Sequence, residues 1–225
     1  MLLTVNNNST CPQYNLAHEE YLCSLNLELF MLWQNEPSVI AGRFCDVNHD
    51  VNIDSGIQII RRNSGGGSVY HDLGNINYTF ILRDNKNFTL KYFSDIIIHL
   101  LNIIGINAEL SFRHNDILAD GMKISGAAQY HHDGIILHHG TLLFDSNLEA
   151  MKHALKHSGD VANIKPLLKH DMTVREFMNI LHDNMNIHDT LTLTEEDESR
   201  IKTLMQKKYL NDKWNLEGVK TYNNV

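Results

Sequence analysis

Two Asp-Gly dipeptides place the strongest constraint on how this chain can fold. Asp120-Gly121 and Asp133-Gly134 each stand between short apolar runs in the stretch 108–144. Glycine adopts positive φ without strain, so Asp-Gly is typical of the tight turn that joins two antiparallel strands. This stretch is therefore predicted to be β-rich and folded into hairpins. Its predicted strands are Ala108–Phe112, Ile117–Ala119, Lys123–Gln129 and Ile135–Phe144.

Periodic patterns on either side of this stretch predict further elements. The expected strands are Leu27–Trp33, Ser38–Ala41, Ile57–Arg61 and Asn77–Leu82. The expected helices are Asn15–Leu25, Phe88–Ile104, Leu148–Lys156, Val174–Asn184 and Glu195–Tyr209. In the second of these helices, Tyr92, Ile96 and Ile103 are expected to form the buried stripe together with His99 or Leu100.

This order of elements predicts an α+β fold, with a mixed or antiparallel β-sheet core flanked by helices. The helices are concentrated in a C-terminal portion at about 146–225. The sequence contains no internal repeat and no low-complexity tract, and the only visible seam lies at 158–166. We therefore expect one domain over residues 1–225.

Composition excludes several classes of partner. A formal net charge of −8 disfavours non-specific binding to nucleic acids or anionic membranes, because both favour basic surfaces. The sequence has no apolar run of about 18 residues, and its first residues lack the basic and apolar regions of a signal peptide. Its three cysteines have no metal-site spacing. We expect a cytoplasmic protein without nucleic-acid or membrane partners.

The segment from Arg61 to Asp72 carries the clearest chemical signal. Its three successive glycines, Gly65–Gly67, allow backbone N–H groups to approach phosphate or carboxylate oxygens closely. Arg62 adds a permanent charge for the same oxygens. The segment lacks the Lys-Ser/Thr pair of a Walker loop, and Tyr70 replaces the third glycine of the dinucleotide fingerprint. Composition alone leaves a flexible surface hairpin loop equally open.

A lysine and two pairs of adjacent histidines lie in the β-rich stretch. Lys123 precedes the small residues Gly126–Ala128, which leave room for a ligand whose developing charge an ammonium would neutralise. The pattern alone favours a solvated lysine. His138 and His139 point to opposite faces of a strand, so they cannot easily share a metal ion. One of them is expected to face the core or a pocket, whereas His131 and His132 flank a turn and are expected to be exposed.

Together these segments resemble the lipoate–protein ligase A family. The family's motifs are matched by Arg61–Asn75, Asn115–Ile117, Lys123–Ala128 and His138–Leu143, with weaker matches at Asn15–Tyr21 and Lys213–Asn215. The matches cover nearly the whole chain in order. The resemblance implies the fold of the biotin/lipoate ligase catalytic domain. It also implies a reaction in which lipoate and ATP give lipoyl-AMP and pyrophosphate before a carrier lysine attacks the mixed anhydride.

The resemblance assigns roles residue by residue. The residues implied to contact ATP and the adenylate phosphate are Arg62, Gly67, Ser68, Val69 and Tyr70. Lys123 is implied as the catalytic residue that contacts both nucleotide and lipoate, and Asp116 as a nucleotide-side residue and candidate Mg²⁺ ligand. The residues implied to line the lipoyl tunnel are Gly65, Gly66, His71, Ala127 and His139. The implied partner is a lipoyl carrier domain of the glycine cleavage H protein or of a 2-oxoacid dehydrogenase acyltransferase subunit.

The chain departs from the family pattern in two places. Gly42-Arg43 is followed by Phe44-Cys45-Asp46, where the family often has His-Gln-Asn, and this leaves lipoate or octanoate preference open. The sequence also stops soon after Trp214-Asn215, where longer ligases begin a small accessory domain. Three possibilities follow: a separate accessory polypeptide, a one-domain enzyme that still activates lipoate, or a transferase that accepts preformed lipoyl-AMP. We expect this chain alone to transfer from lipoyl-AMP faster than it carries out the complete reaction from lipoate and ATP.

Three other functions compete with this interpretation. An octanoyl or lipoyl amidotransferase needs a cysteine nucleophile, but no cysteine follows Cys45. A biotin ligase shares the fold but has a different glycine-rich motif. A non-catalytic lipoate-binding module would keep the pocket without needing Arg62, Asp116 and Lys123.

Overall fold

The helices and strands enclose three clusters of buried apolar side chains. The computed structural model describes residues 1–112 and 116–218, so Asn115 and the end of the predicted C-terminal portion lie outside the described residues. Within the described residues, the strands are β1 Leu2–Val5, β2 Glu28–Trp33, β3 Ser38–Ala41, β4 Gln58–Arg61, β5 Val69–His71, β6 Asn75–Arg83, β7 Ala108–Leu110, β8 Ile117–Ala119, β9 Met122–Ser125, β10 Ala127–His132, β11 Ile135–Leu143 and β12 Thr190–Leu191. The α-helices are α1 Pro12–Ser24, α2 Val47–Asp50, α3 Leu90–Ile103, α4 Leu148–Ala154, α5 Val174–Asn184 and α6 Glu195–Leu204.

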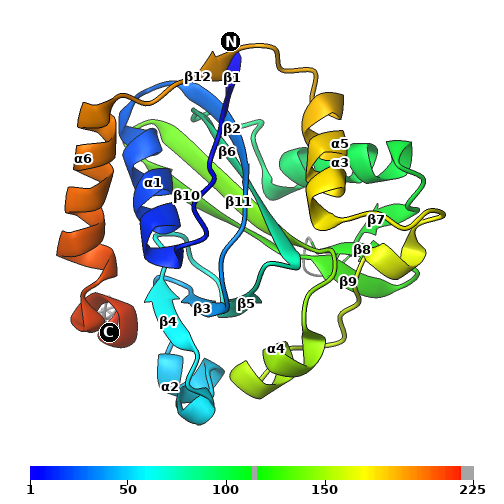
Figure 1. The fold of residues 1–225 in the computed structure, drawn as a ribbon, viewed down its shortest axis with the longest axis horizontal. Coiled ribbons are helices and arrows are strands. Elements are labelled where there is room, and N and C mark those ends of the chain that lie inside the picture. The colour runs from blue at the N-terminus through cyan, green and yellow to red at the C-terminus, as the bar shows by residue number, and fades with distance from the viewer. Residues whose placement is uncertain (113–115, 219–225) are drawn as a thin grey trace.

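The central sheet is mixed, as the sequence predicted. Its six strands lie in the order β10-β11-β6-β2-β1-β12 (Figure 1). The pairs β10–β11, β11–β6 and β6–β2 are antiparallel, whereas β1 is parallel to both β2 and β12. Helices flank this mixed sheet, so the fold belongs to the predicted α+β class.

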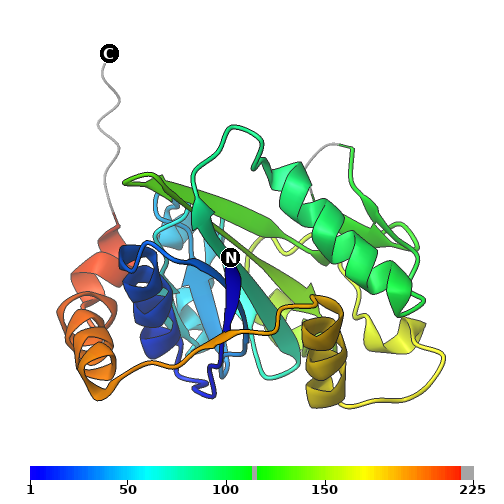
Figure 2. The ribbon, with the colours of Figure 1, turned by 90° about the horizontal axis from the view of Figure 1, so that it is seen from above.

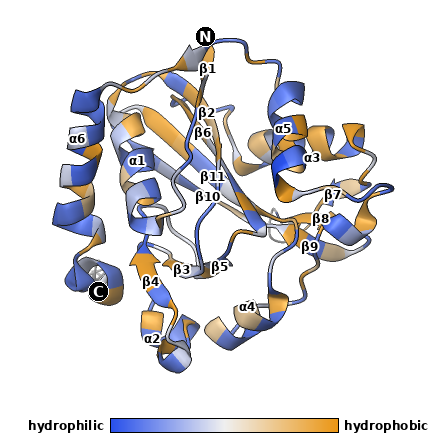
Figure 3. Ribbon diagram, viewed as in Figure 1, coloured by the Kyte–Doolittle hydropathy of each residue, from blue (hydrophilic) through white to orange (hydrophobic). Residues whose placement is uncertain are grey.

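Helices cover both faces of the central sheet. Figure 2 shows α1 and α6 on one side of it and α3 and α5 on the other. On β2, Phe30 joins the core cluster under α3 and α5, while Met31 and Trp33 join the cluster under α1 and α6. This follows from the two-residue period of a strand, since neighbouring side chains point to opposite faces. In Figure 3 the apolar residues gather on the sheet and on the inner sides of the helices.

Two small sheets complete the architecture. One is β4-β3-β5, in which β3 pairs parallel with β4 and antiparallel with β5. The other is the antiparallel β7-β8-β9. Both predicted Asp-Gly turns form with positive φ at each central residue, +49° and +75° at Asp120-Gly121 and +48° and +75° at Asp133-Gly134. These values match the type I′ hairpin turn that the dipeptide favours.

One predicted strand and the predicted buried face of one helix need correction. The single strand expected at Lys123–Gln129 is two strands, because the chain leaves the β7-β8-β9 sheet at Gly126 and enters the central sheet as β10. In α3, Leu100 is buried as expected, but the rest of the buried face is one position away from the expected stripe: Phe93 and Ile97 are buried, while Tyr92 and Ile103 are exposed. Residues 96–98 are three successive isoleucines, which fit either of two neighbouring stripes.

The ends of two helices also differ from the prediction. Helix α1 begins at Pro12, three residues before the expected start, since proline suits the first turn, where its missing N–H costs nothing. Helix α6 ends at Leu204 and continues as a π-helical turn over Met205–Tyr209, and a second π-helical turn spans Lys213–Glu217. In residues 1–112 and 116–218, no helix is both long and apolar enough to cross a membrane.

Candidate active site

A cavity of about 230 Å³ lies where the chain passes from one sheet to another. It is lined by Leu16, Trp33, Ile40, Arg62, Gly66, Gly67, Ser68, Val69, His71, Asn77, Asp116, Lys123, Gly126, Ala127, Ala128, His139, Gly140 and Thr141. These residues come from all three sheets and from α1. A small cavity with a mixed apolar and charged lining is the usual form of a site for a small ligand.

The glycine-rich loop, residues 62–68, forms one wall and is held by close backbone packing. A Cβ on Gly42 would overlap with the carbonyl oxygen of Gly66, so only glycine allows the two segments to meet there. The N–H of Arg43 also donates to the carbonyl of Ser64 at 2.8 Å. Gly66 itself has φ +86°, which an L side chain rarely adopts.

Arg62 points into the loop and organises its carbonyls. Its Nη2 donates to the carbonyls of Gly65 and Gly67 at 2.7 and 2.9 Å. Its Nη1 donates to Ile40 at 2.9 Å, and its Nε to the Ser64 hydroxyl at 2.8 Å. Burial lowers the pKa of Arg62 to about 10, so the guanidinium still carries its charge at neutral pH. The side chain thus puts a positive charge beneath the loop.

Lys123 and Asp116 form the charged part of the lining. The Lys123 Nζ lies 3.0 Å from Asp116 Oδ1, and the two side chains are 39% and 18% exposed. Gly126 makes room for this pair, because a Cβ there would lie 3.1 Å from Lys123 Nζ and 3.5 Å from Asp116 Oδ1. Lys123 pairs with Leu118 in the β7-β8-β9 sheet, and its side chain lines the cavity beside Gly126.

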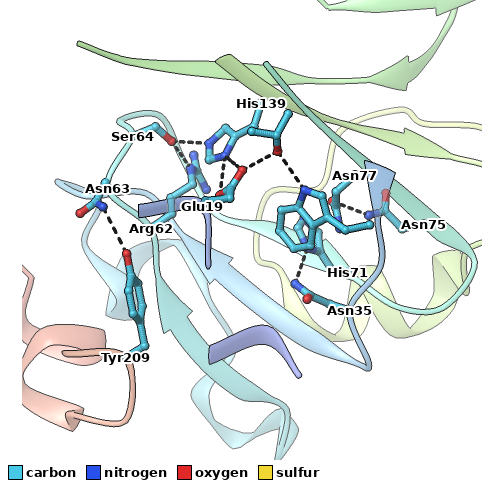
Figure 4. A network of polar contacts seen from close by, with 12 residues as sticks. Glu19, Asn35, Arg62, Asn63, Ser64, His71, Asn75, Asn77, His139 and Tyr209 are labelled. Atoms are coloured by element: carbon cyan, nitrogen blue, oxygen red, sulfur yellow. Dashed lines mark hydrogen bonds and ion pairs between the residues drawn. The ribbon is translucent and has the colours of Figure 1, made fainter. Parts of the chain in front are cut away.

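A buried relay of hydrogen bonds connects the glycine-rich loop to α1 (Figure 4). The Ser64 hydroxyl accepts from Arg62 Nε and forms a hydrogen bond with His139 Nε2 at 2.6 Å. The other ring nitrogen of His139 donates to the Glu19 carboxylate at 3.1 Å. Glu19 also accepts from the hydroxyl of Thr79 at 2.5 Å. The polar atoms of His139 are thus satisfied within the protein, although its ring lines the cavity.

A second set of contacts fixes the ring of His71. The Asn35 amide oxygen accepts from Asn15 at 2.8 Å, so the Asn35 nitrogen donates to His71 Nδ1 at 3.0 Å. The hydrogen of a neutral His71 ring must then be on Nε2. Burial, aided by the positive charge of Arg62, lowers the pKa of His71 to about 3. His71 is therefore uncharged at neutral pH, and Arg62 and Lys123 supply the positive charge of the lining.

The cavity collects most of the residues implied by the resemblance. Those on its lining are Arg62, Gly66, Gly67, Ser68, Val69, His71, Asp116, Lys123, Ala127 and His139. Two lie elsewhere. The ring of Tyr70 is buried in a core cluster with Val39 and Leu143, because it alternates with Val69 and His71 along β5. Gly65 is not on the lining, and its carbonyl accepts from Arg62.

Sequence reasoning missed the apolar part of the lining. Leu16, Trp33 and Ile40 come from α1, β2 and β3 and belong to one core cluster. Each fitted its own helix or strand pattern, so only the tertiary contacts reveal its place beside the loop. Asn77 and Thr141 were also missed. They lie opposite each other on β6 and β11, a pairing that only the structure shows.

The exposed pair of histidines was predicted correctly, whereas of His138 and His139 only one was expected to face the core or a pocket, and both do. His131 and His132 are exposed beside the β10–β11 turn, while both His138 and His139 are buried on opposite faces of β11. His138 stacks on Phe93 with ring centroids 4.3 Å apart. In the described part of the chain, no three His, Cys, Asp or Glu side chains are grouped so that they could hold a metal ion.

A larger, open groove of about 780 Å³ runs between α1, α6 and the β10–β11 hairpin. It shares only Leu16 and His139 with the smaller cavity. None of the three loop glycines lines it, and neither do Lys123 and Asp116. We therefore place the chemistry in the smaller cavity, where the charged groups converge.

Buried histidines predict a loss of stability in acid. Burial lowers the pKa of His18 to about 4 and of His71 and His138 to about 3. The unfolded chain takes up these protons below about pH 6.5, whereas the folded chain does not, so stability falls as the pH drops from 6.5 towards 4. Each such histidine lowers the free energy of unfolding by up to about 1.4 kcal/mol for each pH unit in this range. Denaturant unfolding measured from pH 7 to 4.5 checks this.

A histidine variant tests whether the buried His18 contributes to this pH dependence. His18→Leu is expected to make the pH dependence shallower, because neither ring nitrogen of His18 has a hydrogen-bond partner in the described structure. His182→Gln, at a half-exposed position on α5, serves as the control. An equal slope in all three proteins would contradict the assignment of the acid sensitivity to buried histidines.

Comparisons with known proteins agree on one family. Residues 11–186 match the family model of the lipoyl protein ligase A/B catalytic domain. The chain is 38% identical, over 244 aligned positions, to the lipoate–protein ligase LplJ of Bacillus subtilis (strain 168), covering 96% of this chain and 73% of that protein.

Solved structures show the same architecture. A crystal structure of lipoate–protein ligase A bound with ATP has a TM-score of 0.81 and 26% identity, covering 96% of this chain and 97% of that one. A chain of the archaeal bi-partite lipoate protein ligase of Thermoplasma acidophilum, from a study that includes its E2 lipoyl domain, has a TM-score of 0.84. It is 24% identical and covers 98% of each chain, a likeness of fold.

Proposed function

This chain belongs to the lipoyl protein ligase A/B catalytic domain family and is a ligase, and on that basis we propose that it joins lipoate to a lysine of a lipoyl carrier domain through lipoyl-AMP. In this proposal residues 1–225 form the catalytic domain. ATP, which is bound in one similar crystal structure, supplies the energy of activation.

The mixed lining of the small cavity is the observation that supports the proposal best. Leu16, Trp33 and Ile40 offer an apolar surface, while Lys123 and Arg62 bring positive charge to the same small space. A lipoyl substrate has this same combination of an apolar chain and a terminal carboxylate. Burial of such a chain contributes about 0.8 kcal/mol per CH₂ group, and the charged groups orient the carboxylate.

In the first half-reaction, a lipoate carboxylate oxygen forms a bond to the α-phosphorus of ATP. The bond from that phosphorus to the bridging oxygen breaks, and pyrophosphate leaves with the electron pair. The transition state spreads negative charge over the α-phosphate oxygens. We assign its neutralisation to the Lys123 ammonium, with the backbone of Gly67 and Ser68 and the buried charge of Arg62 holding the phosphates.

In the second half-reaction, the neutral amine of the carrier lysine attacks the acyl carbon of lipoyl-AMP. A C–N bond forms, the bond to the AMP oxygen breaks, and the attacking nitrogen loses a proton. Lys123 is placed to stabilise the oxyanion on the acyl carbon, because one ammonium can serve both steps if carboxylate and phosphate meet beside it. Gly66, His71, Ala127 and His139 are proposed to hold the acyl chain meanwhile.

The donors around Lys123 fit a magnesium ion that arrives with the nucleotide. Mg²⁺ is commonly bound through one or two carboxylates together with substrate phosphates. Asp116 is the single carboxylate on the described cavity lining and would provide this contact. When bound, the ion would neutralise phosphate charge. The Asp116 carboxylate meanwhile holds the Lys123 ammonium at 3.0 Å.

The proposed partner is a lipoyl carrier domain, from the glycine cleavage H protein or a 2-oxoacid dehydrogenase acyltransferase subunit. The study of the archaeal structural neighbour includes an E2 lipoyl domain, which favours this kind of partner. The test incubates the pure chain with lipoate, ATP, Mg²⁺ and a lipoyl domain, and reads the mass of the carrier. A parallel reaction replaces lipoate and ATP with synthetic lipoyl-AMP.

These two reactions separate the alternatives. Acylation of the carrier in both supports the full ligase. Acylation from lipoyl-AMP alone identifies a transferase without the activation step. Failure of both, with a carrier that an established ligase modifies, contradicts the proposal and leaves a lipoate-binding module. Octanoate in place of lipoate then measures the acyl preference.

A cysteine substitution tests the amidotransferase alternative. Cys45→Ser is expected to keep at least half of the ligase activity, because an adenylate mechanism needs no thiol. Cys45 is not on the cavity lining, although its Sγ lies 3.4 Å from the Ser68 hydroxyl. The measurement is carrier acylation, with mass spectrometry of the enzyme. An acyl adduct on Cys45 that disappears together with activity in the variant would establish a thioester mechanism instead.

A further inference from the structure

The two adjacent arginines, Arg61 and Arg62, point in opposite directions. Arg62 faces the glycine-rich loop, as described above, while Arg61 faces away from it and is fully buried. The motif resemblance and the proposed chemistry give Arg61 no role. In the part of the chain that the structure describes, no carboxylate forms an ion pair with it. A buried charge without such a partner is costly unless other polar groups surround it.

Backbone carbonyls from two separate segments surround the Arg61 guanidinium. Nη1 donates to Gly42 at 2.6 Å and to Cys45 at 3.0 Å. Nε donates to Trp214 at 3.0 Å and Nη2 to Leu216 at 3.2 Å. One side chain thus joins the turn at residues 42–45 to the C-terminal segment, residues 205–218.

The backbone of Arg61 is bound to the same C-terminal segment. Its N–H donates to Asn215 Oδ1 at 3.1 Å, and its carbonyl accepts from the Trp214 indole at 2.9 Å. Gly218 lies against the guanidinium with φ +66°, and a Cβ there would be 2.7 Å from Arg61 Cζ. The C-terminal segment therefore packs closely against Arg61 and is hydrogen-bonded to both its backbone and its side chain.

A second contact joins the C-terminal segment to the loop entrance. The Lys208 ammonium donates to Asn63 at 2.7 Å and to Glu20 at 2.8 Å, and lies 4.3 Å from the centre of the Trp214 ring. The Tyr209 hydroxyl also donates to Glu20, at 2.5 Å. The segment that makes these contacts contains both π-helical turns, a geometry that often occurs at functional positions.

We propose that Arg61 is a positioning residue that clamps the C-terminal segment to the 42–45 turn and thereby holds the glycine-rich loop in its nucleotide-binding shape. The 42–45 turn contacts the glycine-rich loop at two places. Gly42 packs directly on Gly66, and the N–H of Arg43 donates a hydrogen bond to the carbonyl of Ser64. The part of this inference that concerns ATP rests on the proposed function. The clamp itself is a property of the fold.

Gly218→Ala tests the clamp without touching the cavity. The added Cβ displaces the Arg61 guanidinium, because the two cannot occupy the same space. Gly105→Ala is the matched control: Gly105 also has positive φ, +89°, but a Cβ there meets no atom within 4 Å. Both variants place a Cβ at a positive-φ glycine, but only Gly218→Ala places it against Arg61.

The readouts are the Kd for ATP in the presence of magnesium, amide hydrogen exchange of residues 63–68, and the unfolding temperature. Gly218→Ala is expected to raise the Kd at least about fivefold, the lower end of usual coupling between sites. It is also expected to speed exchange in the loop by more than the change in global stability explains, and the unfolding temperatures of the two variants measure that change. Equal exchange and equal Kd in the two variants would overturn the proposal.

A double-mutant cycle checks that the effect passes through Arg61. Arg61→Lys cannot reach all the carbonyls, so it is expected to weaken ATP binding despite keeping the charge. Adding Gly218→Ala to it should then change little, whereas additive effects would contradict the clamp. If the wild-type chain binds no ATP, the proposed function fails, and loop exchange alone still decides the clamp.

Discussion

Lys123→Ala is expected to lower lipoyl transfer to the carrier by about 10³-fold, in line with the loss of one preorganised transition-state donor. Lys123 forms an ion pair with Asp116 on the lining of the small cavity, and Gly126 leaves the space that its ammonium occupies. No other lysine lines this cavity among the described residues. The measurement is the rate of carrier acylation, from lipoate with ATP and from lipoyl-AMP.

The loss should be catalytic and not structural. Lys123 is 39% exposed, and an ion pair this open to solvent contributes only about 0–1 kcal/mol to stability. Unfolding by denaturant should therefore be almost unchanged. Lys123→Arg is expected to remain poor, because a planar guanidinium does not replace a compact ammonium between two oxygens.

Lys152→Ala is the matched control. Lys152 also pairs with one carboxylate, that of Glu149 at 3.1 Å, but it lies on the exposed side of α4. The Lys152→Ala variant should transfer the lipoyl group at the wild-type rate. Turnover by Lys123→Ala close to that of Lys152→Ala would remove Lys123 from the mechanism.

Gly42→Ala is expected to lower kcat/KM for ATP by about 100-fold, although residue 42 carries no side chain and does not line the cavity. The new Cβ would overlap with the carbonyl of Gly66, which is backbone and cannot rotate away. The loop must therefore move, and a displacement of about 1 Å at a catalytic site can cost a factor of this size. Overpacking of this kind also destabilises by about 1–3 kcal/mol.

Gly65→Ala provides the contrast within the same loop. A Cβ on Gly65 would meet no atom within 4 Å, and its φ is not positive. This variant is therefore expected to keep most of its activity. Comparable losses in the two variants would show that Gly65 touches the substrate, as the family resemblance implies, and that the packing of Gly42 on Gly66 is not what shapes the loop.

Local chemistry fixed much of what could be predicted from the sequence. Asp120-Gly121 and Asp133-Gly134 form the expected hairpin turns, because their φ preferences are intrinsic to the residues. Helix α5 has the predicted bounds, with a capping box between Thr173 and Glu176. The family resemblance is also confirmed, since its motifs are contiguous runs whose order the fold preserves.

Long-range packing decided the rest. The residues of Lys123–Gln129 fit one strand, and only the competition between two sheets divides them at Gly126. Tyr70 matches the binding motif, yet the alternation of β5 turns its ring into the core. The role of Arg61 depends on carbonyls that lie more than 150 positions away in the chain.

The sequence by itself determined the turns, most elements, the family and the chemical groups of the candidate site, because each depends on residues close together in the chain. Only the tertiary structure decided which of those groups meet. Trp33, Lys123 and His139 lie on different strands, and their convergence on one cavity depends on strand register and sheet switching. These are set by the packing of the whole core, and no local preference encodes them.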